Sequence, residues 1–125
     1  MYEVTVEAHF SSGHFLREYY GKCENPHGHN YRVLVTLAGA ELESNGLLLD
    51  FKVLKDILKP VVNYLDHHMI NELAPFDVVN PSAENLAKYF FDETNSRLTE
   101  ITKGRVRVKQ STIFETDTSQ ATYYE

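Results

Sequence analysis

The sequence predicts an α+β fold in which an antiparallel sheet carries two helices on one face. Apolar and polar residues alternate over residues 2–10, which is typical of a strand with one buried face. Apolar residues recur at helical spacing over 51–65, and a second helical stripe begins after Asn80. Because the strands and helices are segregated along the chain, an antiparallel sheet is favoured over a parallel one.

The strand predictions depend on period-2 alternation. Residues 11–26, which follow the first strand, show no period and carry turn signals, so we expect irregular structure there. Asn45-Gly46 predicts a turn, and a short apolar stretch that can form a further strand follows it at 47–50. The other segments that we expect as strands are 27–37, 106–114 and 121–124.

The two expected helices are both amphipathic. The first occupies roughly residues 51–65, and Pro60 inside it predicts a kink or a local break. The second begins near Asn80-Pro81, where Asn80 supplies the N-cap and Pro81 occupies the first turn. No internal repeat, linker or low-complexity tract interrupts the sequence, so we expect residues 1–125 to form a single domain.

Composition and charge exclude several classes of function. The 12 Lys and Arg residues against 18 Asp and Glu residues give a net charge of −6, which argues against binding to nucleic acid. No apolar run approaches the roughly 18 residues that a membrane span needs, so we expect no membrane partner. The N-terminal residues do not resemble a secretory signal, and the single cysteine allows no intrachain disulfide. We therefore expect a cytoplasmic protein. The acidic net charge does not exclude a small phosphorylated substrate, because one local basic pocket would suffice to bind it.

Histidines form the sharpest local pattern. His27 and His29 lie two residues apart at the start of an expected strand, so their side chains share one face. His14, just after the first strand, is the expected third member. Three neutral imidazoles with an open fourth position are the pattern of a catalytic zinc site. A pair of ordinary surface histidines is the alternative, and the nearby third histidine and cysteine disfavour it.

The single cysteine, Cys23, precedes His27 by four residues and leaves three alternatives open. As a fourth ligand it would close the zinc site, and the chain would be a non-enzymatic binding module with structural zinc. Beside the metal it would instead act as a base or nucleophile, because cationic charge lowers the pKa of a thiol. An unrelated three-histidine zinc hydrolase or lyase would give Cys23 no role.

Carboxylates supply the remaining candidates. Asp66 and His67, at the end of the first helix, can form an acid–base pair in which the carboxylate orients the imidazole. The alternative is that His67 only interacts with the negative end of the helix dipole. Glu115, near the end of a late strand, is by itself an ordinary strand-end carboxylate.

With these residues assembled, the chain resembles the 6-pyruvoyl-tetrahydropterin synthase family, which includes the bacterial 6-carboxy-tetrahydropterin synthases of queuosine biosynthesis. The matching motifs follow one another in order along nearly the whole chain. They are Phe10 to His14, Gly21-Lys22-Cys23, His27-Gly28-His29-Asn30-Tyr31, Asp50-Phe51 with Leu54-Lys55, Leu65-Asp66-His67, Pro81-Ser82-Ala83-Glu84-Asn85 and Phe114-Glu115-Thr116.

The resemblance implies a role for each candidate residue. The zinc ligands would be His14, His27 and His29. Cys23 would be the thiolate that abstracts a proton, and Asp66 with His67 would be the remaining catalytic pair, presented across a subunit interface. Glu115 would anchor the pterin, because a carboxylate can accept two parallel N–H bonds from the 2-amino-pyrimidinone edge.

The resemblance also implies the tunnelling fold (T-fold), a four-stranded antiparallel sheet with two helices on one face. Three such subunits close a barrel, and two rings stack into a homo-hexamer.

The implied reaction converts 7,8-dihydroneopterin triphosphate to 6-carboxy-5,6,7,8-tetrahydropterin, acetaldehyde and triphosphate. The alternatives are 6-pyruvoyl-tetrahydropterin, formed by elimination of triphosphate alone, and 6-hydroxymethyl-dihydropterin for folate, which Glu24 beside Cys23 would permit unless it is an ordinary loop carboxylate. Candidate triphosphate contacts are Lys22, Arg17, Arg105, Arg107 and Lys109, and the alternative for each of them is an ordinary solvated charge.

Overall fold

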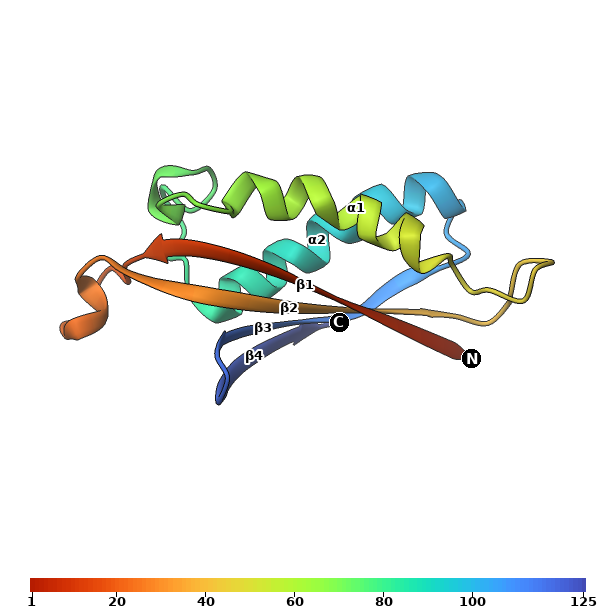
Figure 1. Cartoon of the computed structure of the whole chain (residues 1–125), viewed down its shortest axis with the longest axis horizontal. Helices are drawn as coiled ribbons and strands as arrows, with labels where there is room; N and C mark the ends of the chain where they lie inside the picture. The colour runs from red at the N-terminus through yellow and green to blue at the C-terminus, as the bar shows by residue number, and fades with distance from the viewer.

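The computed structural model describes all 125 residues as a four-stranded antiparallel sheet with two long helices across one of its faces (Figure 1). The strands lie in the sheet in chain order, from β1 to β4. The elements are β1 (Tyr2–His14), β2 (His27–Gly39), α1 (Phe51–Leu65), α2 (Ala83–Thr102), β3 (Arg107–Thr116) and β4 (Ser119–Tyr124). This arrangement confirms the predicted α+β class and the segregation of helices to one face.

The hydrophobic core lies between the sheet and the helices. Phe10 of β1 stacks on Tyr31 of β2 with ring centroids 4.8 Å apart, and on Phe90 of α2 at 5.7 Å. The alternate residues of β1, such as Glu7 and His9, are exposed on the opposite face. Period-2 alternation therefore assigned the buried face of the first strand correctly.

Strand β1 continues to His14, four residues beyond the predicted strand. Irregular structure was expected from residue 11 onward, but Ser11 pairs with Asn30 and His14 pairs with His27 in continuous antiparallel register. The prediction was wrong because polar residues of the candidate site replace apolar ones here, although the side chains still point alternately to the two faces of the sheet. Ser12 and His14 are buried on the helix-covered face. This extension places the two ends of the strands, and their histidines, directly opposite each other.

Helix α1 has the predicted bounds, whereas the start of α2 differs from the predicted one. Ser82, not Asn80, is the N-cap of α2, and its hydroxyl accepts a hydrogen bond from the Asn85 backbone N–H at 3.1 Å. Helix α1 runs without interruption to Leu65, so Pro60 does not end it. Residues 47–50 form bends and no strand. Neither helix is long and apolar enough to cross a bilayer.

The two edges of the sheet differ in how far they are covered. At the C-terminal end of β1, the His67 N–H donates to the Ser11 carbonyl at 2.7 Å, and the Gly13 N–H donates to the His68 carbonyl at 3.0 Å. The rest of β1 and the outer edge of β4 carry no neighbouring strand. Two rows of backbone hydrogen-bonding groups are therefore available to another chain.

Candidate metal centre and active site

Three imidazoles meet on the helix-covered face of the sheet, where β1 ends and β2 begins. His14 is the last residue of β1, and His27 and His29 are the first and third residues of β2. One ring nitrogen from each residue lies within 4.8 Å of those of the other two. The structure therefore brings together the three predicted metal ligands.

Backbone carbonyls fix the orientation of two of these rings. Nδ1 of His14 lies 2.7 Å from the Pro81 carbonyl oxygen, and Nδ1 of His27 lies 2.7 Å from that of Asn25. Because a carbonyl only accepts, Nδ1 carries the proton and Nε2 presents its lone pair, as in metal-binding histidines. Nε2 of His14 is buried without a polar partner, and that of His29 is buried and makes no hydrogen bond, with only the Glu115 carboxylate nearby. The orphaned acceptor on His14 fits a bound cation.

Burial also keeps the imidazoles in the form that binds metal. Desolvation is the main reason that the pKa of His14 and that of His29 fall below 6.5, and neighbouring imidazoles lower them further. The carboxylate of Glu115 opposes the shift in both cases, without cancelling it. At neutral pH His14 and His29 are therefore uncharged, and neither has to lose a proton before a cation binds. Three neutral imidazoles are a suitable donor set for zinc with a fourth position open.

Cys23 lies outside this cluster of ring nitrogens. It is half-buried in a single helical turn, Lys22–Glu24, within the connection from β1 to β2. Its carbonyl accepts a hydrogen bond from the Leu16 N–H at 2.6 Å, which ties the loop back to the end of β1. The structure therefore brings together three candidate ligands, without Cys23 as a fourth.

Glu115 connects the histidine cluster to a neighbouring pocket. Its Oε1 lies 3.3 Å from Nε2 of His29, and the side chain is partly exposed. The pocket, of about 460 Å³, lies between the start of α2 and β4, and Glu84 also lines it. Sequence reasoning had given Glu84 no role, although it belongs to the matched Pro81–Asn85 motif. Two carboxylates therefore border one polar pocket beside the candidate metal ligands.

Asp66 and His67 form the predicted pair at the end of α1. Oδ2 of Asp66 lies 3.0 Å from Nδ1 of His67, and its Oδ1 accepts the Ser11 backbone N–H at 2.9 Å. These two hydrogen bonds, the one from Ser11 first, lower the pKa of Asp66. His67 has a φ of 57°, a left-handed conformation, and its side chain is 81% exposed. The imidazole is thus oriented by the carboxylate and open to solvent.

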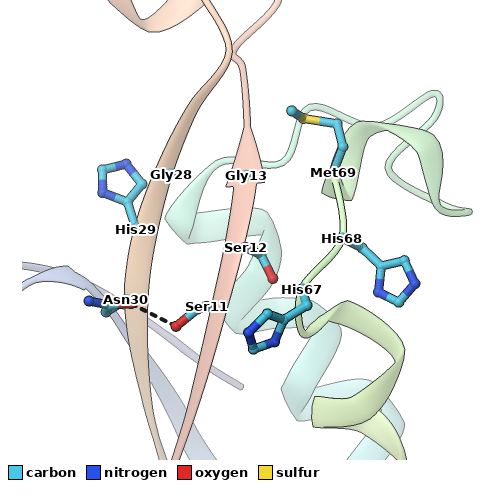
Figure 2. A pocket seen from close by; sticks show the side chains of 9 residues that line it. All are labelled: Ser11, Ser12, Gly13, Gly28, His29, Asn30, His67, His68 and Met69. Atoms are coloured by element: carbon cyan, nitrogen blue, oxygen red, sulfur yellow. Dashed lines mark hydrogen bonds between the residues drawn. The ribbon is translucent and has the colours of Figure 1, made fainter.

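The Asp66–His67 pair is separated from the histidine cluster of its own chain. In Figure 2, His29 projects from β2 away from β1, whereas His67 lies beyond the other side of β1. A pocket of about 500 Å³ spans this region. Its lining residues are Ser11, Ser12, Gly13, Gly28, His29, Asn30, His67, His68 and Met69.

Most candidate triphosphate contacts have structural partners. Arg17 donates to the Phe76 carbonyl at 2.9 Å, and Arg105 donates to the Leu48 carbonyl at 2.8 Å. Glu3 pairs with Lys109. Lys22 and Arg107 are exposed, and neither makes an ion pair in this chain.

Glu24 is the residue that was considered for folate chemistry. Its side chain accepts the Tyr20 backbone N–H at 2.8 Å and so stabilises its own loop.

Comparisons with known proteins agree with this geometry. Residues 3–125 match the family model described as 6-pyruvoyl tetrahydropterin synthase. The chain is 34% identical over 127 residues to the 6-carboxy-5,6,7,8-tetrahydropterin synthase of Bacillus subtilis (strain 168), covering 98% of this chain and 84% of that protein. It is 33% identical over 109 residues to the human 6-pyruvoyl tetrahydrobiopterin synthase, covering 83% and 71%.

Solved structures have the same fold. The 6-pyruvoyl tetrahydropterin synthase of Caenorhabditis elegans superposes with a TM-score of 0.84 at 30% identity, covering 100% of this chain and 97% of that one. A structure of the Plasmodium vivax 6-pyruvoyltetrahydropterin synthase gives 0.80 at 23% identity, covering 99% and 97%. The chain therefore belongs to the 6-pyruvoyl tetrahydropterin synthase family, and its subunit has the T-fold.

Proposed function

We propose that this chain is a zinc-dependent lyase of queuosine biosynthesis. It converts 7,8-dihydroneopterin triphosphate and one water molecule to 6-carboxy-5,6,7,8-tetrahydropterin, acetaldehyde and triphosphate. The observation that carries the proposal is the cluster of three imidazoles, with Nε2 of His14 buried and unpartnered, beside the carboxylate of Glu115. The Bacillus subtilis relative, which matches nearly the whole chain, bears the name of this activity.

The metal ligands would be His14, His27 and His29. Zinc bound there supplies Lewis-acid chemistry, polarising an oxygen of the substrate side chain and acidifying the adjacent C–H bond. The chain's own contribution is orientation, because the Pro81 and Asn25 carbonyls hold two of the rings by Nδ1. This leaves only a small reorganisation when the cation binds.

Glu115 would anchor the pterin in the pocket that it shares with Glu84. A carboxylate can accept two parallel N–H bonds from the 2-amino-pyrimidinone edge, which fixes the ring in position and orientation. Because Glu115 also lies 3.3 Å from His29, a pterin held there would lie beside the metal ligands. Its side chain starts at the opposite end of the ring from the anchored edge, so it would reach the cluster with the ring lying alongside the histidines, and the carboxylate would fix that orientation.

Proton transfer would be carried by Cys23 and by the Asp66–His67 pair. A thiolate near a cation has a lowered pKa, so Cys23 would abstract a proton from the substrate side chain. Asp66 holds Nδ1 of His67, which leaves Nε2 free to exchange a proton as a general acid or base. Since this pair lies on the far side of β1 from its own cluster, we assign it to the site of a neighbouring subunit.

The assembly that we propose is a homo-hexamer made of two trimeric rings. The free part of β1 and the outer edge of β4 are different surfaces, so pairing β4 of one subunit with β1 of the next is a heterologous contact that can close a ring. Such closure would leave no exposed strand edge. Two stacked rings of three subunits complete the hexamer.

The test is product analysis. The zinc-loaded protein is incubated with 7,8-dihydroneopterin triphosphate, and pterin and volatile products are identified by mass spectrometry, with His27→Ala as the control that lacks a ligand. We expect 6-carboxy-5,6,7,8-tetrahydropterin and acetaldehyde in equal amounts from the wild-type protein and neither from the variant. Accumulation of 6-pyruvoyl-tetrahydropterin or 6-hydroxymethyl-dihydropterin would contradict the proposed reaction and assign the chain to biopterin or folate supply.

A further inference from the structure

The outer edge of β1 continues past the end of the strand as a row of hydrogen bonds to side chains. The Phe15 N–H donates to Oδ1 of Asn71 at 2.9 Å, and Nδ2 of Asn71 donates back to the Phe15 carbonyl at 3.0 Å. Two residues on, the Arg17 N–H donates to Oδ1 of Asn80 at 2.9 Å, and Nδ2 of Asn80 donates to the Arg17 carbonyl at 3.1 Å. Each primary amide offers one donor and one acceptor and so replaces a peptide group of a neighbouring strand.

The backbones of these two asparagines are held by other contacts. Asn71 is only 6% exposed, and its backbone belongs to the short helical turn Ile70–Glu72. The backbone carbonyl of Asn80 accepts a hydrogen bond from Nδ2 of Asn85, in the first turn of α2, at 2.8 Å. Contacts outside the 15–17 segment therefore anchor both asparagines, which makes them suitable partners for it.

The segment that they hold determines the position of His14. Asn80 directly precedes Pro81, whose carbonyl accepts the hydrogen bond from Nδ1 of His14. The Asn80-Pro81 dipeptide thus fixes the ring of the ligand and also the backbone three residues after it. Asn71 fixes Phe15, the residue that immediately follows the ligand.

The same segment also determines where the cysteine loop begins. Leu16, between the two clamped residues, donates its N–H to the Cys23 carbonyl at 2.6 Å. Residues 15–17 therefore lie between the two asparagine amides on one edge and the turn that carries Cys23 on the other. A shift of this segment would move His14 and Cys23 together.

We propose that Asn71 and Asn80 are positioning residues of the metal centre. They hold residues 15–17 so that Nε2 of His14 faces those of the other two histidines and the Cys23 turn stays tied to the end of β1 through Leu16. This inference rests on the proposed function, because it takes the three histidines as a metal site. The inference goes beyond the proposed function because it explains the geometry of the site by two side-chain amides. These amides contact neither the rings of the metal ligands nor the substrate pocket.

The experiment compares Asn71→Ala and Asn80→Ala with a matched control. Asn95 also uses its amide to hold a strand, since its Oδ1 accepts the Val108 N–H at 3.1 Å, but it joins α2 to β3. Cobalt(II) titration of the metal-free proteins, followed by absorption, measures affinity and ligand geometry. Urea unfolding of the metal-free proteins measures stability, and amide hydrogen exchange at Phe15 and Arg17 reports the clamp itself.

We expect Asn71→Ala and Asn80→Ala to weaken cobalt binding by about 10-fold or more, to alter the cobalt spectrum and to lose exchange protection at Phe15 or Arg17. Asn95→Ala should lose stability to a similar extent and keep wild-type cobalt affinity. Wild-type affinity and spectrum in the first two variants, despite lost protection, would overturn the inference. Should either alanine variant fail to fold, Asn71→Asp and Asn80→Asp take its place, because they keep an acceptor oxygen and lose the donor. The negative charge that they add would by itself strengthen cation binding, so a weaker cobalt affinity still reports the lost donor.

The outcome for the proposed function is distinguishable from the outcome for this inference. If the wild-type protein binds no cobalt, or His27→Ala binds it equally well, the metal site fails and the inference fails with it. If the wild-type protein binds cobalt through His27 but the asparagine variants behave like Asn95→Ala, the inference alone is wrong.

Discussion

Nε2 of His29 lies 3.3 Å from Oε1 of Glu115, so one candidate metal ligand and the candidate pterin anchor are neighbours on adjacent strands. The contact joins two regions with different chemistry: a cluster of three imidazoles and a polar pocket bordered by carboxylates. A substrate with a pterin ring at one end and a reactive side chain beside it fits across this boundary. The boundary also makes the two roles separable by mutation.

Replacing Glu115 with glutamine should weaken pterin binding and leave metal binding nearly unchanged. The amide turns one of the two acceptor oxygens into a donor, which opposes an N–H of the pterin edge. Hydrogen bonds to a charged group are worth roughly 1.5–3 kcal/mol, so we expect KM to rise by at least about 10-fold. Steady-state kinetics and cobalt titration measure the two effects. Loss of cobalt binding would instead identify Glu115 as a metal ligand.

Cys23→Ala should retain the metal and lose most of the activity. The thiol lies outside the group of clustered nitrogens, so its removal takes no ligand from the site. If the thiolate abstracts the proton, turnover should fall by about 100-fold or more, whereas Cys23→Ser should recover little of it. Metal content and single-turnover rates test this. A strong thiolate charge-transfer band in the cobalt-substituted wild-type protein, absent from Cys23→Ala, would favour a closed structural site.

Sequence patterns predicted the parts of the fold that follow local rules. Alternation located the first part of β1, because its apolar residues face the core. It missed the last four residues, where Ser12 and His14 occupy core-facing positions for the sake of the site. The histidine cluster was predictable because two ligands share a strand face and the third is close in sequence.

The remaining features depend on contacts between distant segments. Asn80 has the sequence context of a helix cap, but its amide binds the backbone of Arg17, and Ser82 caps α2 instead. Arg17 resembled a phosphate contact until the structure placed its guanidinium on loop carbonyls such as that of Phe76. No local pattern distinguishes these uses, since each depends on where a segment some 60 residues away folds back.

Asp66 should make the metal-free protein sensitive to acid. Hydrogen bonds from Ser11 and His67 lower its pKa in the folded state below 3.8, its ordinary value. The stabilisation is therefore fully present above that value and is lost as the pH falls through the folded-state pKa. Urea unfolding of wild-type protein and Asp66→Asn between pH 7 and pH 3 should show a stability difference that shrinks at the acid end.

The control for this measurement is Asp117→Asn, at an exposed carboxylate in the turn between β3 and β4 that makes no hydrogen bond or ion pair. Its stability profile should follow that of the wild-type protein. A difference between wild-type protein and Asp66→Asn that stays constant down to pH 3 would show that the Asp66 carboxylate does not supply the stabilisation.

Blocking a hydrogen-bond donor on the free edge of β1 should disrupt assembly and leave metal binding intact. His9 lies on the same alternation as Ser11, whose N–H and carbonyl both face the outer edge, so His9→Pro removes an edge donor and keeps the bonds to β2. His9→Ala, which retains that donor, is the matched control. Light scattering after size exclusion should show smaller species for His9→Pro and the wild-type assembly for His9→Ala. Because His14, His27 and His29 belong to one chain, His9→Pro should still bind cobalt, yet it should lose activity because the Asp66–His67 pair of its neighbour is gone. A full-sized, active His9→Pro assembly would show that this edge is not the subunit interface.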